Sequence, residues 1–453
     1  MSLLAGLVLT GCAALGPDAP DSKVSQKLAP SAWRGPDANQ VRATGPWWHT
    51  LEDATLSRLV ERALGSSPSL DIAQAKVWAA RAARSQVFAS GLPSLASSAQ
   101  ASRSQSGTAQ PLGQAAARLD ASWELDLFGA VRRGQEGANA RAQASEQALS
   151  AARVSLSAEV ANAYVQYRAC QSSRRLNQQD LASRQATLTL TRASVEAGAT
   201  APYLLNRTQA SWEDARAQQA ALASQCEQLE NLLSRLTGEP VDPLVASLNE
   251  VPPDVLLDKT LDLWAVGLPS DVLSLRPDVQ AAQSTWAAAS ADVGLAMADQ
   301  LPRFSLSGSL SYSAQDAGKT MTAGGWSFGP TLSLPLFDAG RRAGATQAAQ
   351  ARLSEARASY EAVVAQAVQE VNDGLSRYRA TLERKAATAA SAREYEQFFR
   401  AVSLRHQEGA SSLLELEDAR RVWLAASLSA LSAKQEHLQA WVYLNKVTAG
   451  ATP

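Results

Sequence analysis

The chain has 453 residues, of which 46% are hydrophobic, so it is long enough to bury a sizeable core and too apolar to be disordered throughout. About one residue in five is Ala and only 6% are aromatic, a composition that favours long helices packed closely through small side chains. Lys and Arg (42) nearly balance Asp and Glu (43), and this lack of basic excess argues against a nucleic-acid partner.

Residues 1–11 predict a signal peptide. An apolar run ends in Leu9-Thr10-Gly11-Cys12, and small residues before a Cys resemble a bacterial lipobox, in which Cys12 becomes the lipidated first residue of the mature protein. The alternative is an ordinary secretory segment with a chance Cys, and no Lys or Arg precedes the apolar run. Residues 12–45, rich in Pro, Ser and Asp, predict a lipidated tether.

Two copies of one unit follow, at residues 46–250 and 251–453. Each copy predicts a helix (68–90 or 277–299), two strands and a long helical hairpin. Segments match in chain order at a nearly constant offset, which is 337 − 128 = 209 for the first pair. The matching pairs are Leu127-Phe128-Gly129-Ala130 with Leu336-Phe337-Asp338-Ala339, Tyr167-Arg168-Ala169 with Tyr378-Arg379-Ala380, and Ala197-Gly198-Ala199 with Glu408-Gly409-Ala410.

Period-two alternation predicts strands at about 117–127 in the first copy, and at about 303–313 and 326–337 in the second. A partner strand is predicted at about 94–106, where the Ala- and Ser-rich sequence is ambiguous. In the third strand Phe304, Leu306, Leu310 and Tyr312 alternate with Ser residues. Segments of about 10 residues with one oily and one wet face are typical of transmembrane strands. The alternative is an amphipathic sheet on a soluble core. In a membrane, four strands cannot close a pore, so that interpretation requires oligomerisation.

The helical hairpins are predicted at 131–237 and 339–446. Apolar residues recur at coiled-coil spacing in both, for example at Val364, Val368, Val371, Leu375, Tyr378 and Leu382. As a single helix, residues 131–197 would span about 100 Å. The returning helix, 201–237, reaches about half that length, so a short helix such as 68–90 must stack on it end to end.

Catalytic chemistry has no support in the sequence. The three Cys and three His lie far apart, at Cys12, Cys170, Cys226, His49, His406 and His437, with no spacing that would hold a metal. No phosphate-binding Gly loop or nucleophile elbow occurs, and no His lies near a candidate nucleophile. No run of 18 apolar residues predicts a spanning helix. We expect no enzyme, no metal and no cofactor beyond a lipid on Cys12.

These residues together resemble the outer-membrane efflux proteins of the TolC family, and more closely its lipoprotein branch with OprM and the NodT-type factors. The resemblance covers almost the whole chain. It is carried by Trp47-Trp48 with Leu51-Glu52-Asp53, by Leu268-Pro269-Ser270-Asp271-Val272-Leu273 with Arg276-Pro277-Asp278-Val279, and by Leu334-Pro335-Leu336-Phe337-Asp338-Ala339-Gly340-Arg341-Arg342.

The resemblance implies a mainly α fold with a membrane β portion. Three chains would form one duct, a 12-stranded β-barrel in the outer membrane above a long helical coiled-coil barrel in the periplasm. It implies the exit channel of a tripartite efflux pump that passes small molecules such as drugs, with a periplasmic adaptor and an inner-membrane RND-type transporter as partners. The alternatives are an exit duct for type I protein secretion and a pore-less, lipid-anchored periplasmic scaffold.

The resemblance also implies a periplasmic gate just after the turn of the second hairpin, where Glu415 and Asp418 match the family's gate carboxylates. Three copies would bring six carboxylates around a narrow axis. Ser412 and Glu415 also form an S-x-x-E capping box, so a purely structural role is an alternative. The first-copy equivalents are Leu204 and Arg207. The hairpin tips at Gly198 and Gly409 are the implied docking points of the adaptor.

Cys170 and Cys226 lie equally far from the predicted turn at Gly198, since 198 − 170 = 28 and 226 − 198 = 28. Antiparallel helices would place them at the same height. A disulfide is possible in the oxidising periplasm, and two buried free thiols are the alternative.

Overall fold

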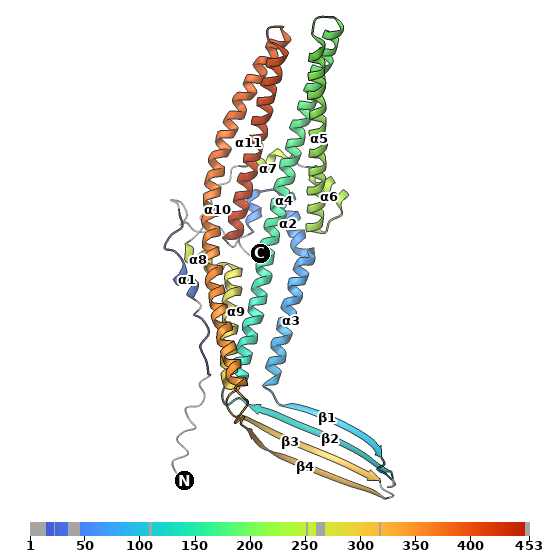
Figure 1. Ribbon diagram of the computed structural model, residues 1–453, viewed down its shortest axis with the longest axis vertical. Helices are drawn as coiled ribbons and strands as arrows, with labels where there is room; N and C mark the ends of the chain where they lie inside the picture. Colours follow the sequence, from blue (N-terminus) through green and yellow to red (C-terminus); the bar gives the residue numbers. More distant parts are fainter. Residues whose placement is uncertain are drawn as a thin grey trace. The chain divides into compact units, whose positions relative to one another are not determined.

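The computed structural model describes residues 15–21, 23–34, 46–107, 111–250, 252–259, 268–316 and 319–448. Cys12 and the predicted signal peptide at 1–11 lie outside these ranges. Within them most residues are helical, and four strands form one antiparallel sheet (Figure 1). Among the described helices, none combines the length and the apolar composition needed to cross a bilayer.

The two sequence copies have the same succession of elements. Helices α4 and α10 both contain 67 residues, and their first residues are 341 − 130 = 211 apart. The first copy has α3 (Pro68–Ser90), β1 (Ser94–Ser104), β2 (Leu112–Leu125), α4 (Ala130–Glu196) and α5 (Pro202–Thr237). The second has α9 (Pro277–Ala298), β3 (Arg303–Asp316), β4 (Thr320–Ser333), α10 (Arg341–Gln407) and α11 (Leu413–Val447).

Shorter helical segments complete the described chain. They are α1 (Val24–Leu28), the 3-10 helix η1 (Trp47–Leu51), α2 (Ala54–Ser66), α6 (Val241–Leu248), α7 (Asp254–Leu257) and α8 (Pro269–Leu275). Asp53 caps α2, because its carboxylate accepts a hydrogen bond of 2.9 Å from the Leu56 amide. Helices α5 and α8 begin at Pro, whose missing N–H is unused at a first helical position.

The chain divides into two compact units, and neither coincides with a sequence copy. Unit 1 comprises residues 1–28, 73–149 and 278–364, and it contains the sheet. Unit 2 comprises residues 29–72, 150–277 and 365–453, and it contains both hairpin turns. Each unit therefore combines segments of both copies.

The sheet has the order β1-β2-β3-β4, so β2 and β3 join the two copies. The register aligns the apolar residues in rows across the strands, such as Leu119, Leu310 and Trp326. The neighbouring row carries Asp120, Ser309 and Ser327 on the opposite face. Serine hydroxyls there bond across strands, for example Ser309 to Ser327 at 2.9 Å. The predicted alternation is therefore confirmed.

The strand ends differ from the prediction. β4 begins at Thr320, six residues before the predicted start, because cross-strand pairing carries Gly324 and Gly325 into the sheet despite their low strand propensity. It ends at Ser333, so Leu334 to Phe337 are not strand; Pro335 there has no N–H for a ladder. Similarly, β2 begins at Leu112 and ends at Leu125 instead of spanning 117–127, β3 extends to Asp316, and β1 ends at Ser104.

The coiled-coil stripe of α10 is buried over most of its length. Val364, Val371, Leu375 and Tyr378 are at most 3% exposed, whereas Leu382 is 46% exposed and leaves the core. A stripe with strict heptad spacing drifts around a straight helix, because 3.6 residues per turn do not divide seven. The last predicted position therefore faces solvent.

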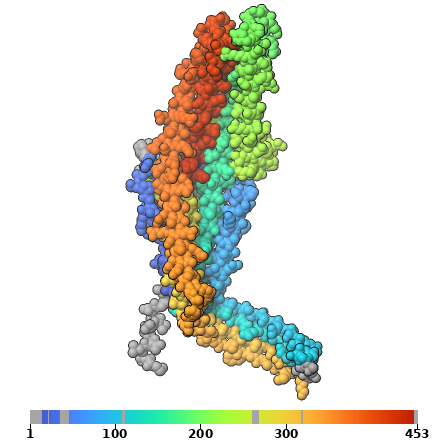
Figure 2. Space-filling model, in the orientation of Figure 1, coloured from blue at the N-terminus to red at the C-terminus, as the bar shows by residue number. Residues whose placement is uncertain are grey.

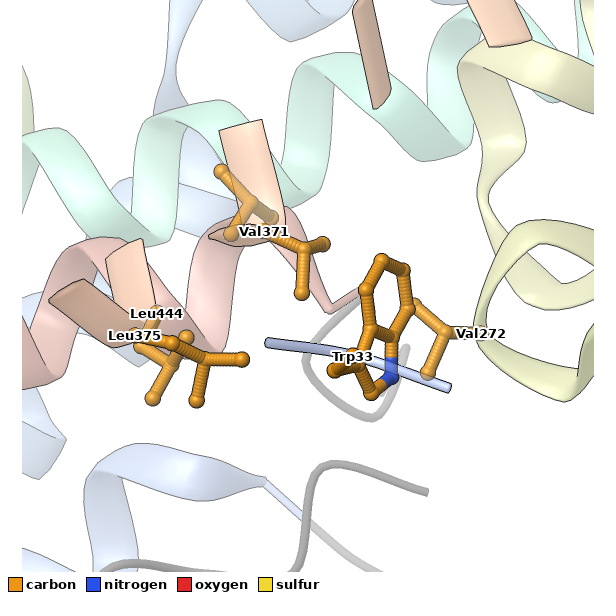
Figure 3. Close-up of a cluster of buried hydrophobic side chains, with 6 residues drawn as sticks. Trp33, Val272, Val371, Leu375 and Leu444 are labelled. Carbon is orange, nitrogen blue, oxygen red and sulfur yellow. The ribbon is translucent and has the colours of Figure 1, made fainter. Parts of the chain in front are cut away.

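The predicted tether is not a free linker in its described part. In unit 1, Arg133 donates to the carbonyl oxygen of Leu15 at 2.9 Å and Ser290 to that of Asp18 at 2.8 Å. In unit 2, the Trp33 indole is buried beside α8, α10 and α11 (Figure 3). Its cluster contains Val272, Val371, Leu375, Leu444 and Val447. The composition of residues 12–45 predicted a linker because it carries no information about partners that lie more than 100 residues away in the sequence.

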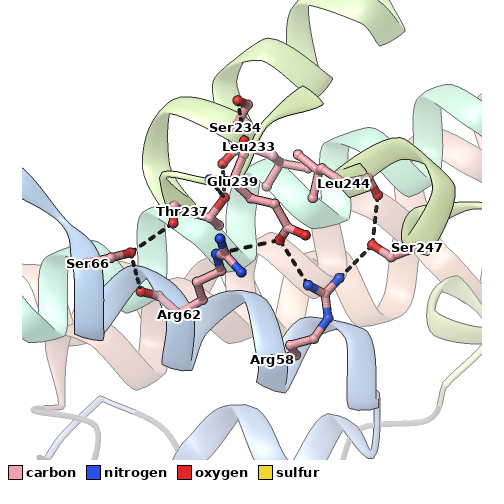
Figure 4. Close-up of polar contacts among 9 residues, drawn as sticks. All are labelled: Arg58, Arg62, Ser66, Leu233, Ser234, Thr237, Glu239, Leu244 and Ser247. Atoms are coloured by element: carbon pink, nitrogen blue, oxygen red, sulfur yellow. Dashed lines mark hydrogen bonds and ion pairs between the residues drawn. The ribbon is translucent and has the colours of Figure 1, made fainter. Parts of the chain in front are cut away.

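Helix α2 packs in unit 2 on the end of α5 and on α6 (Figure 4). Arg58 bridges them, donating to the Glu239 carboxylate at 2.9 Å and to Ser247 Oγ at 2.6 Å. Ser66 Oγ donates to the carbonyl oxygen of Thr237, one of the last carbonyls of α5, at 2.9 Å. These bonds satisfy polar groups that the end of a helix leaves without partners.

Candidate functional site

Both hairpin turns are closed by the same backbone motif. Gly198 and Gly409 have φ of +73° and +75°, a conformation that costs residues with a Cβ about 1 kcal/mol or more. The next amides, of Ala199 and Ala410, donate back to Ser194 O at 2.9 Å and Arg405 O at 2.8 Å. This is a Schellman motif. The tips that the sequence predicted as docking points are thus ordered turns.

Glu415 forms hydrogen bonds and an ion pair with residues of its own chain. The Ser412 hydroxyl accepts from the Glu415 amide at 3.2 Å, as the capping-box interpretation predicted. The Glu415 carboxylate accepts from Ser411 Oγ at 3.0 Å and lies 3.7 Å from Arg405 Nη1. Its contacts are those of a residue that stabilises the start of α11 and fixes the turn.

Asp418 is more exposed and has one ionic partner, Arg421, at 2.9 Å. It lines a hollow of about 260 Å³ between α5 and α11, together with Leu414 and Arg421. The first-copy equivalents Leu204 and Arg207 line the same hollow. Within unit 2, the structure therefore brings Asp418 of the second copy next to Leu204 and Arg207 of the first copy.

Sequence reasoning missed Arg420, which is 3% exposed. It pairs with Glu417 and donates from Nη2 to Thr187 Oγ1 of α4 at 3.0 Å. Figure 2 shows the second hairpin, in orange and red, beside the green end of the first. A signal was available: Leu416, Arg420 and Leu424 are spaced by four, so Arg420 occupies the apolar stripe, whereas Arg421 does not.

A second hollow, of about 340 Å³, opens between the hairpins near their turns. Its lining includes the apolar side chains of Leu190, Leu413 and Leu416 and two threonines, Thr187 and Thr191. His406 also lines it, with its Nδ1 2.8 Å from the carbonyl oxygen of Ser411. Such a surface can hold an apolar side chain, and it offers no reactive group.

Cys170 and Cys226 form a disulfide between α4 and α5. The structure thus contains the covalent pair that the sequence suggested. The duplication maps these positions onto Thr381 and His437, since 170 + 211 = 381 and 226 + 211 = 437. Thr381 Oγ1 lies 3.3 Å from His437 Nδ1, so a hydrogen bond occupies in the second hairpin the place of the disulfide in the first.

Among the described residues no group of His, Cys, Asp or Glu is arranged to hold a metal ion. Two acidic residues near the tip are instead paired with arginines of their own helix, Asp418 with Arg421 and Glu417 with Arg420. The arrangement can hold two helical hairpins together and present charge at their ends.

Comparison with known proteins adds the family. A family model described as "Outer membrane efflux protein" matches residues 59–239 and 268–450, one match in each sequence copy. OprJ, an outer membrane protein of Pseudomonas aeruginosa, is 31% identical over 433 residues, which cover 93% of this chain and 89% of that protein.

Two further relatives match nearly the full length. Nodulation protein T of Rhizobium leguminosarum bv. viciae is 28% identical over 98% of this chain and 92% of its own. The antibiotic efflux pump outer membrane protein ArpC of Pseudomonas putida is 29% identical, over 98% of this chain and 93% of its own. The solved structure of the outer-membrane channel OprN superposes with a TM-score of 0.82 at 29% identity, covering 97% of this chain and all of that one.

Proposed function

Because this chain belongs to the outer membrane efflux protein family, as its sequence predicted, we propose that it is the exit duct of a tripartite efflux pump. The family consists of channel proteins and not enzymes, and its members lie in the outer membrane. In the proposal, three copies of the chain form one duct, which passively conducts small molecules such as drugs to the outside of the cell.

The apolar face of the four-stranded sheet carries this proposal. Trp326 is 81% exposed, and Leu310 and Phe328, which share its face, are 59% and 70% exposed. Burying such residues contributes about 1.5–3 kcal/mol each, so the face needs a cover. Lipid is a suitable cover for the whole face, and the Ser-rich opposite face suits water.

Three copies would supply the twelve strands needed for a closed sheet, since four strands cannot enclose a lumen. Closure would also pair the free edges of β1 and β4, which are otherwise open to aggregation. The helical hairpins would continue the duct in the periplasm. The pore-less scaffold has no use for an exposed oily sheet face, which is why we set it aside.

The energy source and the cargo would come from partners. We propose a periplasmic adaptor that docks at the turns of Gly198 and Gly409, and an RND-type transporter in the inner membrane. Drugs are proposed as cargo because ArpC, a full-length relative, is by name part of an antibiotic efflux pump. A lipid on Cys12 would anchor the chain in the outer membrane. A duct for protein secretion would differ in its pump partner.

The first test combines the mass of the purified protein in detergent with single-channel recording in a planar bilayer. We expect a trimer that gives discrete conductance steps. A folded monomer without conductance would contradict the proposal.

Asp418→Ala tests the gate in the same recordings. We expect open probability to rise, because the substitution removes a carboxylate from the hollow between α5 and α11 and leaves the Arg421 charge there uncompensated, which loosens the closed tip. The loss of one exposed charged contact accounts for up to about a fivefold shift. Glu213→Ala is the matched control, because Glu213 forms an equally exposed pair with Arg216 on α5. Equal effects of both substitutions, or none from Asp418→Ala, would remove Asp418 from the gate.

A further inference from the structure

Arg420 holds the two helical hairpins together at one level. Thr187 lies 198 − 187 = 11 residues before the turn glycine of the first hairpin, and Arg420 lies 420 − 409 = 11 residues after that of the second. The hydrogen bond of 3.0 Å from Arg420 Nη2 to Thr187 Oγ1 therefore joins α11 to α4 about 16 Å from the turns.

The guanidinium is contacted from three helices. Glu417 of α11 pairs with Nη1, Thr187 of α4 accepts from Nη2, and the Phe399 ring of α10 lies 6.0 Å from the guanidinium carbon. Arg420 Nε is buried and has no hydrogen-bond partner among the described residues. A cation buried in this way is held by few bonds, so each of them has a large effect on where it rests.

The surroundings of this contact differ from the rest of α4. Towards the turn, most buried positions of α4 are polar: Asn177, Asp180, Thr187 and Thr191 are at most 6% exposed, and Leu188 is the apolar residue buried among them. Earlier in α4 most buried positions are apolar, as at Val160, Ala161 and Val165. Hydrating a polar interface costs less free energy than hydrating an apolar one. The two hairpins should therefore separate most easily in water at the end of their interface that lies near the turns.

We propose that Arg420 is a positioning residue of the gate, which latches α11 to Thr187 of α4 while the channel is closed. The inference rests on the proposed channel function. Opening would require the Arg420–Thr187 bond to break, so that the second hairpin can move from the first. The planar fork of Arg420 is needed because one nitrogen stays with Glu417 while another reaches Thr187, which a lysine cannot reproduce.

Thr187→Val tests the latch with almost no change of shape. It removes the acceptor of Arg420 together with the bond from Thr187 Oγ1 to Ser183 O. Thr191→Val is the matched control, since Thr191 is also buried in α4 and makes the same kind of bond, to Thr187 O at 2.8 Å, without touching Arg420. We expect open probability in a bilayer to rise about tenfold for Thr187→Val, the effect of one charged hydrogen bond, and to stay unchanged for Thr191→Val.

Rescue and coupling separate a latch from a packing role. Thr187→Ser retains the hydroxyl and should restore the closed state, whereas Arg420→Lys should open the channel as Thr187→Val does. In the Arg420→Lys background, Thr187→Val should have no further effect, because the two side chains act through one bond. Additive effects, or equal effects of the Val and Ser substitutions, would overturn the proposal.

Hydrogen exchange distinguishes failure of the latch from failure of the channel function. A broken latch should raise amide exchange in residues 183–194 and 413–424 of Thr187→Val, and not of Thr191→Val, even in a protein that conducts nothing. If amide exchange rises in Thr187→Val but no variant conducts ions, the latch is supported and the channel function is refuted. Unchanged exchange and unchanged conductance in Thr187→Val would refute the latch alone.

Discussion

Buried polar side chains in unit 2 find their partners on distant segments. Arg168 is 1% exposed and donates to the carbonyl oxygen of Leu248 at 2.7 Å and to the Tyr164 hydroxyl at 2.6 Å. That hydroxyl donates in turn to Asp53 at 2.9 Å. Burial raises the pKa of Tyr164, helped by the charge of Asp53, so the phenol stays neutral and remains a donor. The network joins α2, α4 and α6.

His437 gives a residue-scale prediction of pH dependence. Burial, with a smaller contribution from the positive charge of Lys385, lowers the pKa of His437 to about 4, against about 6.5 in an unfolded chain. Between these values the unfolded state binds more protons. Stability should therefore be complete above about pH 6.5 and fall as the pH drops towards 4.

Replacing the ring tests this assignment. We expect the drop in melting temperature between pH 7 and pH 4.5 to be smaller in His437→Gln than in the wild type. His49→Gln is the control, since the His49 side chain is about half exposed and lies beside Trp48 and the exposed Glu61. An equal drop in wild type and His437→Gln would show that other groups cause the acid sensitivity.

At the scale of elements, the two hairpins are braced differently. In the first, the Cys170–Cys226 disulfide ties α4 to α5; in the second, Thr381 and His437 form a hydrogen bond at the equivalent positions. A covalent brace limits how far two helices can separate, whereas a hydrogen bond contributes only about 1 kcal/mol. The second hairpin, which carries Asp418 and Arg420, is therefore the more easily deformed of the two.

Removal of the disulfide should destabilise the first hairpin. The crosslink closes a loop of 56 residues, and Cys170→Ser with Cys226→Ser should lower the free energy of unfolding by about 2–4 kcal/mol. Thermal unfolding monitored by circular dichroism measures the loss. Mass spectrometry of unreduced peptides from the wild type should find the linked pair; free thiols at both positions would contradict the assignment.

Helix α9 carries a second prediction at this scale, through its contact with the N-terminal segment. A Cβ on Gly294 would lie 2.5 Å from the Leu15 carbonyl oxygen and 2.7 Å from Arg133 Nε. Gly294→Ala should therefore displace residues 15–21 from α9 and increase their cleavage by a protease. Gly344→Ala in α10 is the control, because a Cβ there meets nothing within 4 Å. Equal cleavage of both variants would contradict this contact.

At the scale of the whole molecule, the main feature is the difference in polarity between the two faces of the sheet. Its two faces differ in polarity in β2, β3 and the second half of β4, where the register keeps apolar residues in shared rows, whereas β1 adds Ser97 to the row of Leu119. Two glycines in the rows lie beside aromatic rings: a Cβ on Gly308 would come within 3.4 Å of the Phe328 ring, and one on Gly324 within 3.7 Å of the Tyr312 ring. These strands thus present one largely apolar face.

Two neighbouring substitutions on β3 test this polarity. Leu310→Arg places a charge on the apolar face, where it should cost about 2–4 kcal/mol in a membrane and reduce the amount of protein recovered in the outer membrane. Ser309→Arg, one residue away, places the same charge on the opposite face beside Asp120 and should be tolerated. If both variants were recovered from the outer membrane in equally reduced amounts, the two faces of the sheet would not differ in whether they contact lipid or water.

The sequence alone predicted the duplicated helical hairpins, the amphipathic strands and the disulfide partners, because each depends on local periodicity or on spacing along the chain. It indicated the family through motifs that resemble those of known members. The sequence did not predict the strand ends at Thr320 and Leu112, because pairing with a neighbouring strand determines these ends and local propensity does not. The same holds for Arg420 and for the burial of Trp33 in the predicted tether. Their partners lie on other helices, and only tertiary packing determines which polar side chains are buried together and which remain in water.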